Sequence, residues 1–402
     1  MCRRRIGERA SSNARKLAGS HAGISFLETR EQSIAVAKNF EGAWRQASHT
    51  SHDRRNRKND LSGRAIPSVI PQHLDLSIII VNYRSWDDLA RCLDSLQYLK
   101  DAGNPATEII VVDNRSDDGR FAEFAAQFPW VRFLESPGNY GFAHGCNRGA
   151  VDAQGVELLF LNPDTRDPGH AVHQFLAAKR ARPHVGILTV RQLDARGRPQ
   201  RVFGPFPSAA TLLGPMRALQ RMWRPAAYPD PRRMAGRDFD IDWVSGSALM
   251  IARTDFDALG GWCEDYWMYS EDTDLCWRAA KIGLATAYCG GVALEHRHGG
   301  ATRRDLTIAA LTRSEVIISK HLYAHKHFCG AHAGMYHVLL AITRFLPLSA
   351  SAITACFWRN PMEVTRVRAD MFALLCAYYR GVLTQRNWLS PRRTGQAIHG
   401  TT

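Results

Sequence analysis

The apolar pattern of the chain changes at residue 76, where a run of β-branched residues begins. Residues 76–81 are almost wholly apolar, as in a strand buried on both faces of a parallel sheet. Leucines at positions 89, 93, 96 and 99 follow at helical spacing, and residues 108–112 form a second apolar run. The order of these segments predicts a βαβ unit.

Strand and helix patterns continue to alternate along the chain. They predict helices at 118–128, 143–153 and 273–282, and strands at 131–134, 158–161, 185–190 and 243–251. This alternation predicts an α/β fold with a Rossmann-like sheet and helices on both faces. Nine arginines and several prolines between residues 196 and 237 indicate little regular structure there. Beyond residue 320 the pattern becomes helical and basic.

The composition fits a folded protein with an acidic partner. The chain has 402 residues, of which 45% are hydrophobic and 22% charged, and its net charge is +14. Such a charge favours nucleic acid, anionic lipid or a phosphorylated substrate. Residues 1–73 carry fourteen Lys and Arg against six Asp and Glu and lack sustained apolar periodicity, so we predict a disordered basic arm.

Two features predict a location on the cytoplasmic side of a membrane. The nine cysteines form no C-x-x-C pair and the basic start lacks a secretory apolar region, which favours reduced thiols in the cytoplasm. The apolar stretch 335–357 is interrupted by Arg344 and Pro347. We therefore expect this stretch to lie at the membrane surface or in a helical core, and not to span the bilayer.

Polar residues follow three of the predicted strands. The first strand ends in Asn82 and Tyr83, the second in Asp113 and Asn114, and the strand after Gly155 in Asn162 and Asp164. Ligands of open α/β sheets bind beyond the carboxyl ends of the strands, so these residues should meet at one binding edge. Neither G-x-G-x-x-G after the first strand nor a P-loop is present, which disfavours dinucleotide enzymes and ATPases.

Three further clusters contain residues that could bind a ligand or take part in a reaction. Residues 138–149 hold four glycines and two asparagines where a loop enters a helix, which suits close approach of a phosphate or sugar. Glu271, Asp272 and Asp274 open a predicted helix. His296 and His298 follow a later strand, and either imidazole could complete a metal shell begun by Asp164.

These motifs, taken in order over about 74–304, resemble those of family 2 glycosyltransferases of the rhamnosyltransferase type. The matching segments are Ile78–Tyr83, Val111–Gly119, Gly138–Gly149, Leu161–Asp164, Gly246–Ala248 and Tyr269–Arg278. The resemblance implies the GT-A fold with its mixed sheet. It also implies a nucleotide-diphospho-sugar donor, a divalent cation (Mg²⁺ or Mn²⁺) and inversion at the anomeric carbon.

The resemblance also implies roles for individual residues. Asp113 would hold the nucleotide base, Asp272 of the Glu271–Asp272 pair would be the general base, and Asp164 would stand at the family's D-x-D motif. His296, with His298 close behind, is the candidate metal-binding histidine. Asn162 replaces the first aspartate of D-x-D, which weakens two-carboxylate chelation. The expected nucleotide-sugar contacts are Asn82, Tyr83, Asp113, Asn114, Gly138, Asn139, Gly141, Phe142, Asn147 and Asn162.

We therefore predict a basic arm (1–73), a catalytic domain (74–320) and a helical basic extension at the membrane or acceptor side (321–402). The predicted function is inverting transfer of a sugar, with rhamnose the favoured candidate, to a glycan or lipid-linked glycan in cell-surface polysaccharide synthesis. The enzyme would lie peripherally on the anionic inner face of the cytoplasmic membrane, without a nucleic-acid partner.

Two alternatives stay open from the residues alone. One is a Rossmann-like methyltransferase or oxidoreductase that uses Asp113 for a ribose, although the glycine fingerprint is missing. The other is a non-enzymatic nucleic-acid-binding protein, which the net charge of +14 suggests. Anionic lipid or a lipid diphosphate explains that charge equally well.

Overall fold

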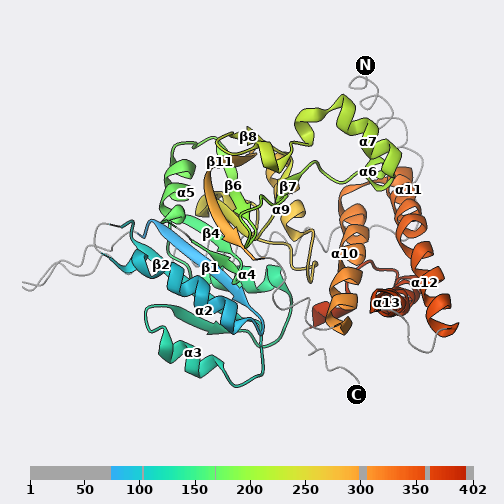
Figure 1. The fold of residues 1–402 in the computed structure, drawn as a ribbon, viewed down its shortest axis with the longest axis horizontal. Helices are drawn as coiled ribbons and strands as arrows, with labels where there is room; N and C mark the ends of the chain where they lie inside the picture. The colour runs from blue at the N-terminus through green and yellow to red at the C-terminus, as the bar shows by residue number, and fades with distance from the viewer. Residues whose placement is uncertain (1–73, 102–103, 168, 298–305, 358–362, 395–402) are drawn as a thin grey trace, which may run out of the picture. The chain divides into compact units, whose positions relative to one another are not determined.

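The computed structural model describes residues 74–394 except 102–103, 168, 298–305 and 358–362 (Figure 1). The basic arm predicted at 1–73 and the candidate ligand His298 lie outside the described residues. The chain divides into two units, residues 1–69 and 70–402, and all the described residues belong to the second.

A mixed sheet forms the centre of residues 74–297. Its strands are β1 (Leu76–Asn82), β2 (Thr107–Asp113), β3 (Arg132–Glu135), β4 (Glu157–Leu161), β5 (Thr165–Arg166), β6 (Val185–Leu193), β8 (Phe239–Asp240), β10 (Ala248–Ala252) and β11 (Ala285–His296). The order is β3-β2-β1-β4-β10-β6-β11-β5, with β8 beside β11. β1 runs parallel to β2 and β4, whereas β10 runs antiparallel to β4 and β6. The predicted mixed α/β fold is confirmed.

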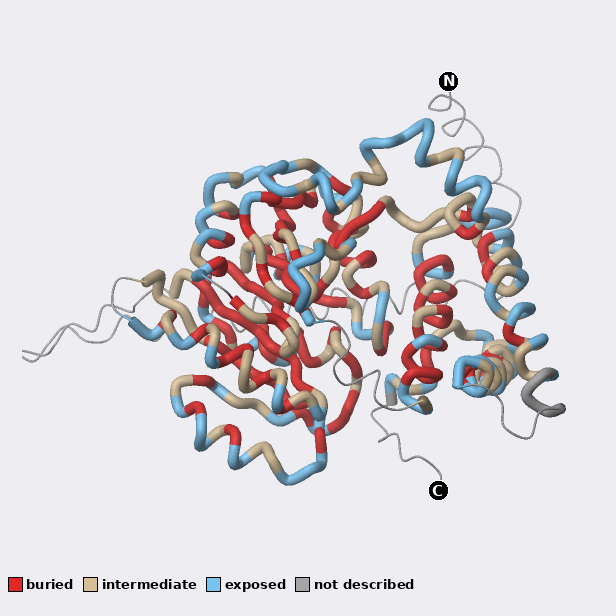
Figure 2. Tube along the Cα trace, viewed as in Figure 1, coloured by how far each residue is buried: buried red, intermediate tan, exposed pale blue. Residues whose placement is uncertain are grey.

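Helices cover both faces of this sheet because the side chains of each strand alternate between two cores. Ile78 and Ile80 of β1 pack on the side of α2 (Trp86–Ser95), α3 (Phe121–Gln127) and α5 (Ala171–Arg180). Ile79 and Val81 face α4 (Phe142–Asp152), α8 (Arg253–Ala258) and α9 (Glu271–Lys281). Burial of each such side chain contributes about 1.5–3 kcal/mol, and the strands stand out as buried in Figure 2.

The predicted strand 243–251 is wrong as a single element. It divides into β9 (Trp243–Val244), which pairs with β7 (Phe203–Gly204) in a second small sheet, and β10 of the main sheet. The chain turns at residues 245–247, where a Cβ on Gly246 would lie 3.2 Å from the rings of Phe142 and Trp262. Aromatic packing above the sheet, which the apolar pattern does not reveal, therefore decides the break.

Two other expectations need correction. The arginine-rich stretch contains α6 (Ala209–Leu212) and α7 (Gly214–Trp223). Pro215 lies in the first turn of α7, where its fixed φ is favourable. No residue of α7 is buried, as Figure 2 also shows. The helical region begins with α10 (Leu306–His327), so the boundary predicted at residue 320 would fall inside a helix.

The helical region consists of α10, α11 (Gly330–Leu340), α12 (Leu346–Phe357) and α13 (Glu363–Gln385), with a π-helical turn at Ala341–Phe345. Together with α6 these helices share one apolar cluster. His321 lies inside it, 2.8 Å from the His337 ring and 2.8 Å from the Tyr379 hydroxyl. Burial and the nearby His337 lower the pKa of His321 to about 3, so this imidazole is neutral near pH 7.

One helical stretch in the described part of the chain is long and apolar enough to cross a membrane. It runs from Gly330 to Ile353, has a mean hydropathy of 1.3 and is 17% buried. The exposed apolar side chains Met335, Val338, Ile342 and Leu346 recur along it at helical spacing. Composition and length alone do not separate a spanning helix from one that lies along a surface.

Candidate active site

Asn82 and Asp113 meet at the carboxyl edge of the sheet, as the sequence predicted. They are register partners at the ends of β1 and β2, and the Asn82 amide donates to Asp113 Oδ1 over 2.8 Å. Asp113 also accepts hydrogen bonds from the backbone N–H and the hydroxyl of Ser116. Burial raises its pKa, against these hydrogen bonds. Each carboxylate oxygen can accept two hydrogen bonds, so Oδ2 keeps one lone pair for a ligand.

The loop before α4 is joined to the loop before α9. The Phe142 backbone N–H donates to the Trp267 carbonyl (3.1 Å), and the Trp267 indole donates to the Asn139 carbonyl (3.1 Å). Gly141 has a φ of +100°, and a Cβ there would lie 2.0 Å from the Trp267 carbonyl oxygen. Only glycine permits this approach. Two motifs more than a hundred residues apart thus become neighbours.

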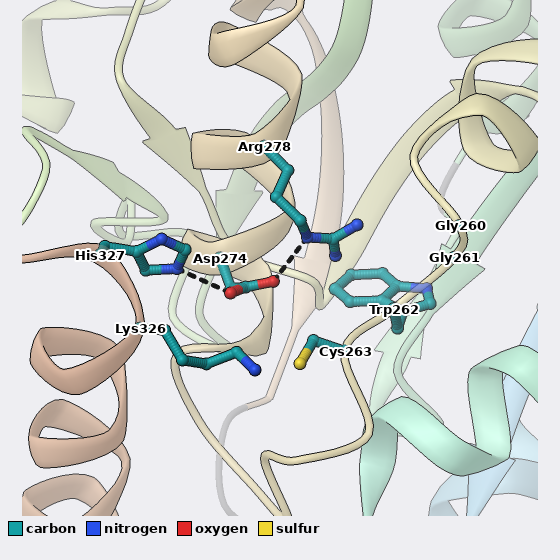
Figure 3. Close-up of a pocket in the computed structure, with 8 residues that line it drawn as sticks. All are labelled: Gly260, Gly261, Trp262, Cys263, Asp274, Arg278, Lys326 and His327. Carbon is teal, nitrogen blue, oxygen red and sulfur yellow. Dashed lines mark hydrogen bonds and ion pairs between the residues drawn. The ribbon is translucent and has the colours of Figure 1, made fainter. Parts of the chain in front are cut away.

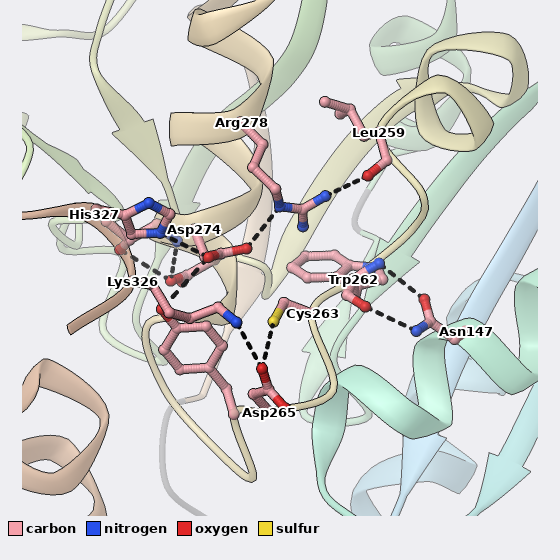
Figure 4. Close-up of polar contacts among 12 residues, drawn as sticks. Asn147, Leu259, Trp262, Cys263, Asp265, Asp274, Arg278, Lys326 and His327 are labelled. Atoms are coloured by element: carbon pink, nitrogen blue, oxygen red, sulfur yellow. Dashed lines mark hydrogen bonds and ion pairs between the residues drawn. The ribbon is translucent and has the colours of Figure 1, made fainter. Parts of the chain in front are cut away.

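Several predicted sugar contacts have structural partners. The Asn114 amide donates to the Gly141 carbonyl over 2.8 Å, and the Gly138 carbonyl accepts from the Ser136 hydroxyl. Asn147 binds both the N–H and the carbonyl of Trp262, each over 2.9 Å (Figure 4). These side chains hold loops in place, which the sequence motif alone did not indicate. Tyr83 is partly exposed beside the Arg84 guanidinium.

The acidic pair begins α9 after two strained residues. Tyr269 and Ser270 have φ values of +70° and +65°, a region that costs a non-glycine residue about 1–3 kcal/mol. Asp272 Oδ1 accepts from the Thr273 N–H (2.7 Å), and Oδ2 accepts from the Gly246 N–H (3.3 Å). Burial raises the pKa of Asp272, although these hydrogen bonds oppose the rise.

Glu271 is more deeply enclosed than its neighbour. Its side chain is 6% exposed, and within the described residues its Oε2 has no hydrogen-bond partner. Burial, together with the charges of Asp272 and Asp274, raises the pKa of Glu271 well above its usual range. A carboxyl in this environment favours the protonated form.

Asp164 and His296 lie together on the same side of the sheet. Pairing of β5 with β11 places Thr165 opposite His296, and the His296 Nε2 is 3.1 Å from Asp164 Oδ1. The Asn162 amide is 3.5 Å from the same nitrogen. His298, the other predicted ligand, falls outside the described residues.

This donor set fits an octahedral cation that is shared with substrate. Within the described residues, no group of three or more His, Cys, Asp or Glu side chains could enclose a metal. One carboxylate and one imidazole leave most of the coordination sites of an octahedral cation open. Water and phosphate oxygens commonly occupy such sites on Mg²⁺ or Mn²⁺.

Residues 245–247 connect the acidic pair with the metal-type pair. The Gly246 N–H donates a hydrogen bond to Asp272. The carbonyl of the next residue, Ser247, accepts a hydrogen bond from the Asn162 backbone N–H over 2.9 Å. Asp272 and the Asn162–Asp164 turn are therefore attached to adjacent residues of one short segment. The apolar pattern predicts a continuous strand here and does not indicate this connection.

One cavity among the described residues lies elsewhere, between α9 and the end of α10. It has a volume of about 380 Å³, and no predicted site residue lines it (Figure 3). The lining residues Arg278 and His327 both bind Asp274 over 2.7 Å. Although burial opposes ionisation, these two partners hold the Asp274 pKa below its usual range. We assign this cavity to the packing of the two helices and not to the reaction.

The helical region braces the strained segment directly. The Ser270 hydroxyl donates to the Ser319 hydroxyl of α10 over 3.2 Å. Next to it, Lys326 binds Asp265 over 2.6 Å, and His327 binds Asp274 (Figure 4). No sequence signal indicated these contacts, because α10 lies outside the motifs.

Comparisons with known proteins bear on the class of enzyme. The model of the family described as "Glycosyl transferase family 2" matches residues 77–245. These residues form a family 2 glycosyltransferase domain. The protein is therefore a glycosyltransferase, which confirms the resemblance and removes the methyltransferase, oxidoreductase and non-enzymatic alternatives.

The glycosyltransferase is similar to several named proteins. The N-acetylglucosaminyl-diphospho-decaprenol L-rhamnosyltransferase of Mycobacterium tuberculosis is 28% identical over 249 residues, covering 57% of this chain and 78% of that protein. Rhamnosyltransferase WbbL of Escherichia coli is 25% identical over 221 residues, covering 52% and 79%. The mannosyltransferase PcManGT structure from Pyrobaculum calidifontis, with GDP-Man and Mn²⁺, has a TM-score of 0.44 at 16% identity and covers 88% and 98%.

Gly141→Ala should destabilise the glycosyltransferase by about 2–6 kcal/mol. The added Cβ would clash with the Trp267 carbonyl, and a φ of +100° is unfavourable for any residue except glycine. Gly197→Ala is the matched control: its φ is +72°, but nothing lies within 4 Å of the added carbon. Backbone strain alone should cost the control about 1–2 kcal/mol. Urea unfolding of both variants measures the difference, and equal losses would contradict the predicted clash.

Proposed function

We propose that this glycosyltransferase transfers a sugar, with inversion, from a nucleotide-diphospho-sugar to a hydroxyl of a glycan or lipid-linked glycan in cell-surface polysaccharide synthesis. L-Rhamnose is the favoured sugar because two similar proteins are named rhamnosyltransferases. A lipid-linked acceptor is favoured because one of them is named for a diphospho-decaprenol substrate.

The observation that carries the proposal is the attachment of Asp272 and the Asn162–Asp164 turn to neighbouring residues, Gly246 and Ser247. An inverting displacement needs a base at the attacking hydroxyl and compensation of charge at the leaving diphosphate. Both groups must lie within reach of one anomeric carbon. A single rigid segment between them supports that requirement.

Asp272 acts as the general base. It takes the acceptor hydroxyl proton while that oxygen bonds to the anomeric carbon and the bond to the nucleoside diphosphate breaks. The raised pKa of Asp272 makes its carboxylate a better proton acceptor than an exposed one. Burial and the charge of Asp272 raise the pKa of Glu271 well above its usual range, which disfavours a second negative charge beside Asp272.

Asp164 and His296 would hold a divalent cation, Mg²⁺ or Mn²⁺. When bound, the cation offsets the negative charge that develops on the leaving group. His296 is 1% exposed, so the sheet fixes its ring beside Asp164. We keep His298 as the alternative histidine ligand.

The donor nucleotide lies at the carboxyl ends of β1 and β2. Asp113 offers its remaining lone pair to the base, oriented by Asn82 and Ser116. We expect Tyr83, Asn139, Phe142 and Asn162 to contact the donor directly. Asn114, Gly138, Gly141 and Asn147 act by shaping the loops. A donor panel tests the proposal: purified protein and Mg²⁺ or Mn²⁺ are mixed with several nucleotide sugars, and donor consumption is measured. Consumption of no donor would oppose it.

We place the enzyme on the inner face of the cytoplasmic membrane as a peripheral protein. Arg217 and Arg221 of α7, and Arg224 directly after it, accompany the exposed Met222 and Trp223. This pattern suits an anionic lipid surface. The apolar stretch Gly330–Ile353 lies along that surface. Nucleic acid has no place in this reaction.

High salt or carbonate should release the enzyme from isolated membranes, because screening weakens the attraction between arginines and anionic lipid. Immunoblots of pellet and supernatant measure the release. Retention through both washes with loss only to detergent would mean that Gly330–Ile353 is inserted.

Asp164→Asn should weaken metal-dependent donor binding by about tenfold or more, because a neutral amide is a poor substitute for a carboxylate beside a divalent cation. Calorimetry with the donor found in the panel, with Mn²⁺ and with EDTA, measures the change. Asp167→Asn is unsuitable as a control because Asp167 binds the start of α5, so the exposed Asp117→Asn serves instead. Equal metal-dependent affinities in Asp164→Asn and the control would refute the metal assignment.

Asp272→Asn should lower transfer by about 10²–10⁴-fold while donor affinity stays near wild type, because the amide keeps the shape but takes no proton. Glu271→Gln is the matched control and should retain transfer, since Gln keeps the shape of a side chain that takes no proton from the acceptor in this mechanism. In wild type, transfer should decline as pH falls through the raised Asp272 pKa, where the base becomes protonated. An inactive Glu271→Gln beside an active Asp272→Asn would move the base by one residue.

A further inference from the structure

A short segment after α13, residues 388–393, connects the helical region with the loop that leads to Asp272. Its first residue, Trp388, stacks on the His337 ring, with the ring centres 3.9 Å apart and the ring planes 9° apart. The Trp388 carbonyl accepts a hydrogen bond from the Tyr378 hydroxyl over 3.0 Å. These contacts fix the start of the segment on α11 and α13.

The middle of the segment is held by a buried carboxylate of α10. The Glu315 side chain is 1% exposed, and its Oε1 accepts hydrogen bonds from the Ser390 hydroxyl (2.9 Å) and from the Arg392 guanidinium. The Arg392 side chain is itself only 14% exposed. A buried ion pair contributes little net stability, because both charges lose their hydration. The pair therefore determines where the segment lies more than how stable the fold is.

The end of the segment lies against the loop that carries Trp267. The Arg392 guanidinium carbon is 6.0 Å from the centre of the Trp267 ring, at the outer limit of a cation–π contact. Next to it, Arg393 binds Asp265 over 3.1 Å. The segment thus contacts the loop just before its strained turn at Tyr269.

The strained turn needs support of this kind. Left-handed backbone at Tyr269 and Ser270 persists only where surrounding contacts compensate for its cost. Trp267 is joined to the loop before α4 by two hydrogen bonds and to the segment by Arg392. If the contact with Arg392 is lost, the start of α9 can shift while the sheet stays folded. A displacement of about 1 Å in a reacting group is enough to lower a rate by about 10²-fold.

We propose that Arg392, anchored by Glu315, is a positioning residue for the general base, and that it acts through Trp267 on the turn that precedes Asp272. This role rests on the proposed function, in which Asp272 takes the acceptor proton. Arg392 acts through the loop and needs no contact with the donor or the acceptor. Residues 388–393 thereby make the helical region part of the catalytic apparatus.

The test uses the double variant Glu315→Gln with Arg392→Met, which removes both charges and leaves an oxygen for Ser390. Because no uncompensated buried charge remains, its Tm should stay equal to that of the wild type or rise. Arg380→Met is the matched control, since it makes the same substitution at an exposed arginine of α13.

The first arm measures hydrogen exchange of the full chain by mass spectrometry. In the double variant, exchange of peptides that cover residues 263–273 should rise about tenfold more than exchange of peptides from β1 and β2, because the loop opens locally. Arg380→Met should change neither set of peptides. A rise that is equal in the loop and the strands, or no rise in the loop, would overturn the positioning role.

The second arm measures steady-state kinetics with the donor found in the panel. The kcat of the double variant should fall about tenfold or more, whereas the KM for the donor stays within about twofold, because the base is displaced and the donor site is not. Arg380→Met should keep the wild-type kcat. If Arg392 only stabilised the fold, the double variant would keep the wild-type kcat together with the wild-type Tm, and that result would refute the proposal.

The two arms separate this inference from the proposed function. Hydrogen exchange needs no donor, metal or turnover, so a failed donor panel would remove the proposed function and leave the exchange result readable. Conversely, transfer that depends on Asp272 but is unchanged in the double variant would keep the function and remove only the role of Arg392.

Discussion

The close approach of the Gly141 backbone to the Trp267 carbonyl is the constraint on which the site depends. It joins the loop before α4 to the loop that leads into α9. The contact needs a backbone without a side chain, and the Trp267 indole adds a second bond to Asn139. Because both loops are fixed on each other, the start of α9 has one position relative to the sheet edge.

That fixed start holds two carboxyl groups, of which Glu271 is buried and Asp272 is partly exposed. Asp272 keeps three hydrogen bonds, two from Thr273 and one from Gly246, whereas within the described part of the chain one Glu271 oxygen has none. Burial therefore raises the pKa of the two carboxyl groups to different degrees. Left-handed backbone at Tyr269 and Ser270 turns the chain sharply into the helix, and such strain persists only where surrounding contacts compensate for it.

The helical region supplies part of that compensation. Ser319 contacts Ser270, His327 binds Asp274 within the first turn of α9, and the Arg392 guanidinium lies 6.0 Å from the Trp267 ring centre. A region that lies beyond the family match of residues 77–245 thus touches the segment that carries the proposed base.

The sequence by itself determined the sheet and its binding edge. Apolar runs such as Ile78–Val81 and Ile109–Val112 identify buried strands, and parallel strands necessarily bring their ends, here Asn82 and Asp113, to one edge. Only the tertiary structure decided the break at Gly246, the structural use of Asn114 and Asn147, and the contacts of α10 with α9. These depend on which side chains meet across long stretches of chain, and periodicity records only which face of an element is apolar, not what packs against it.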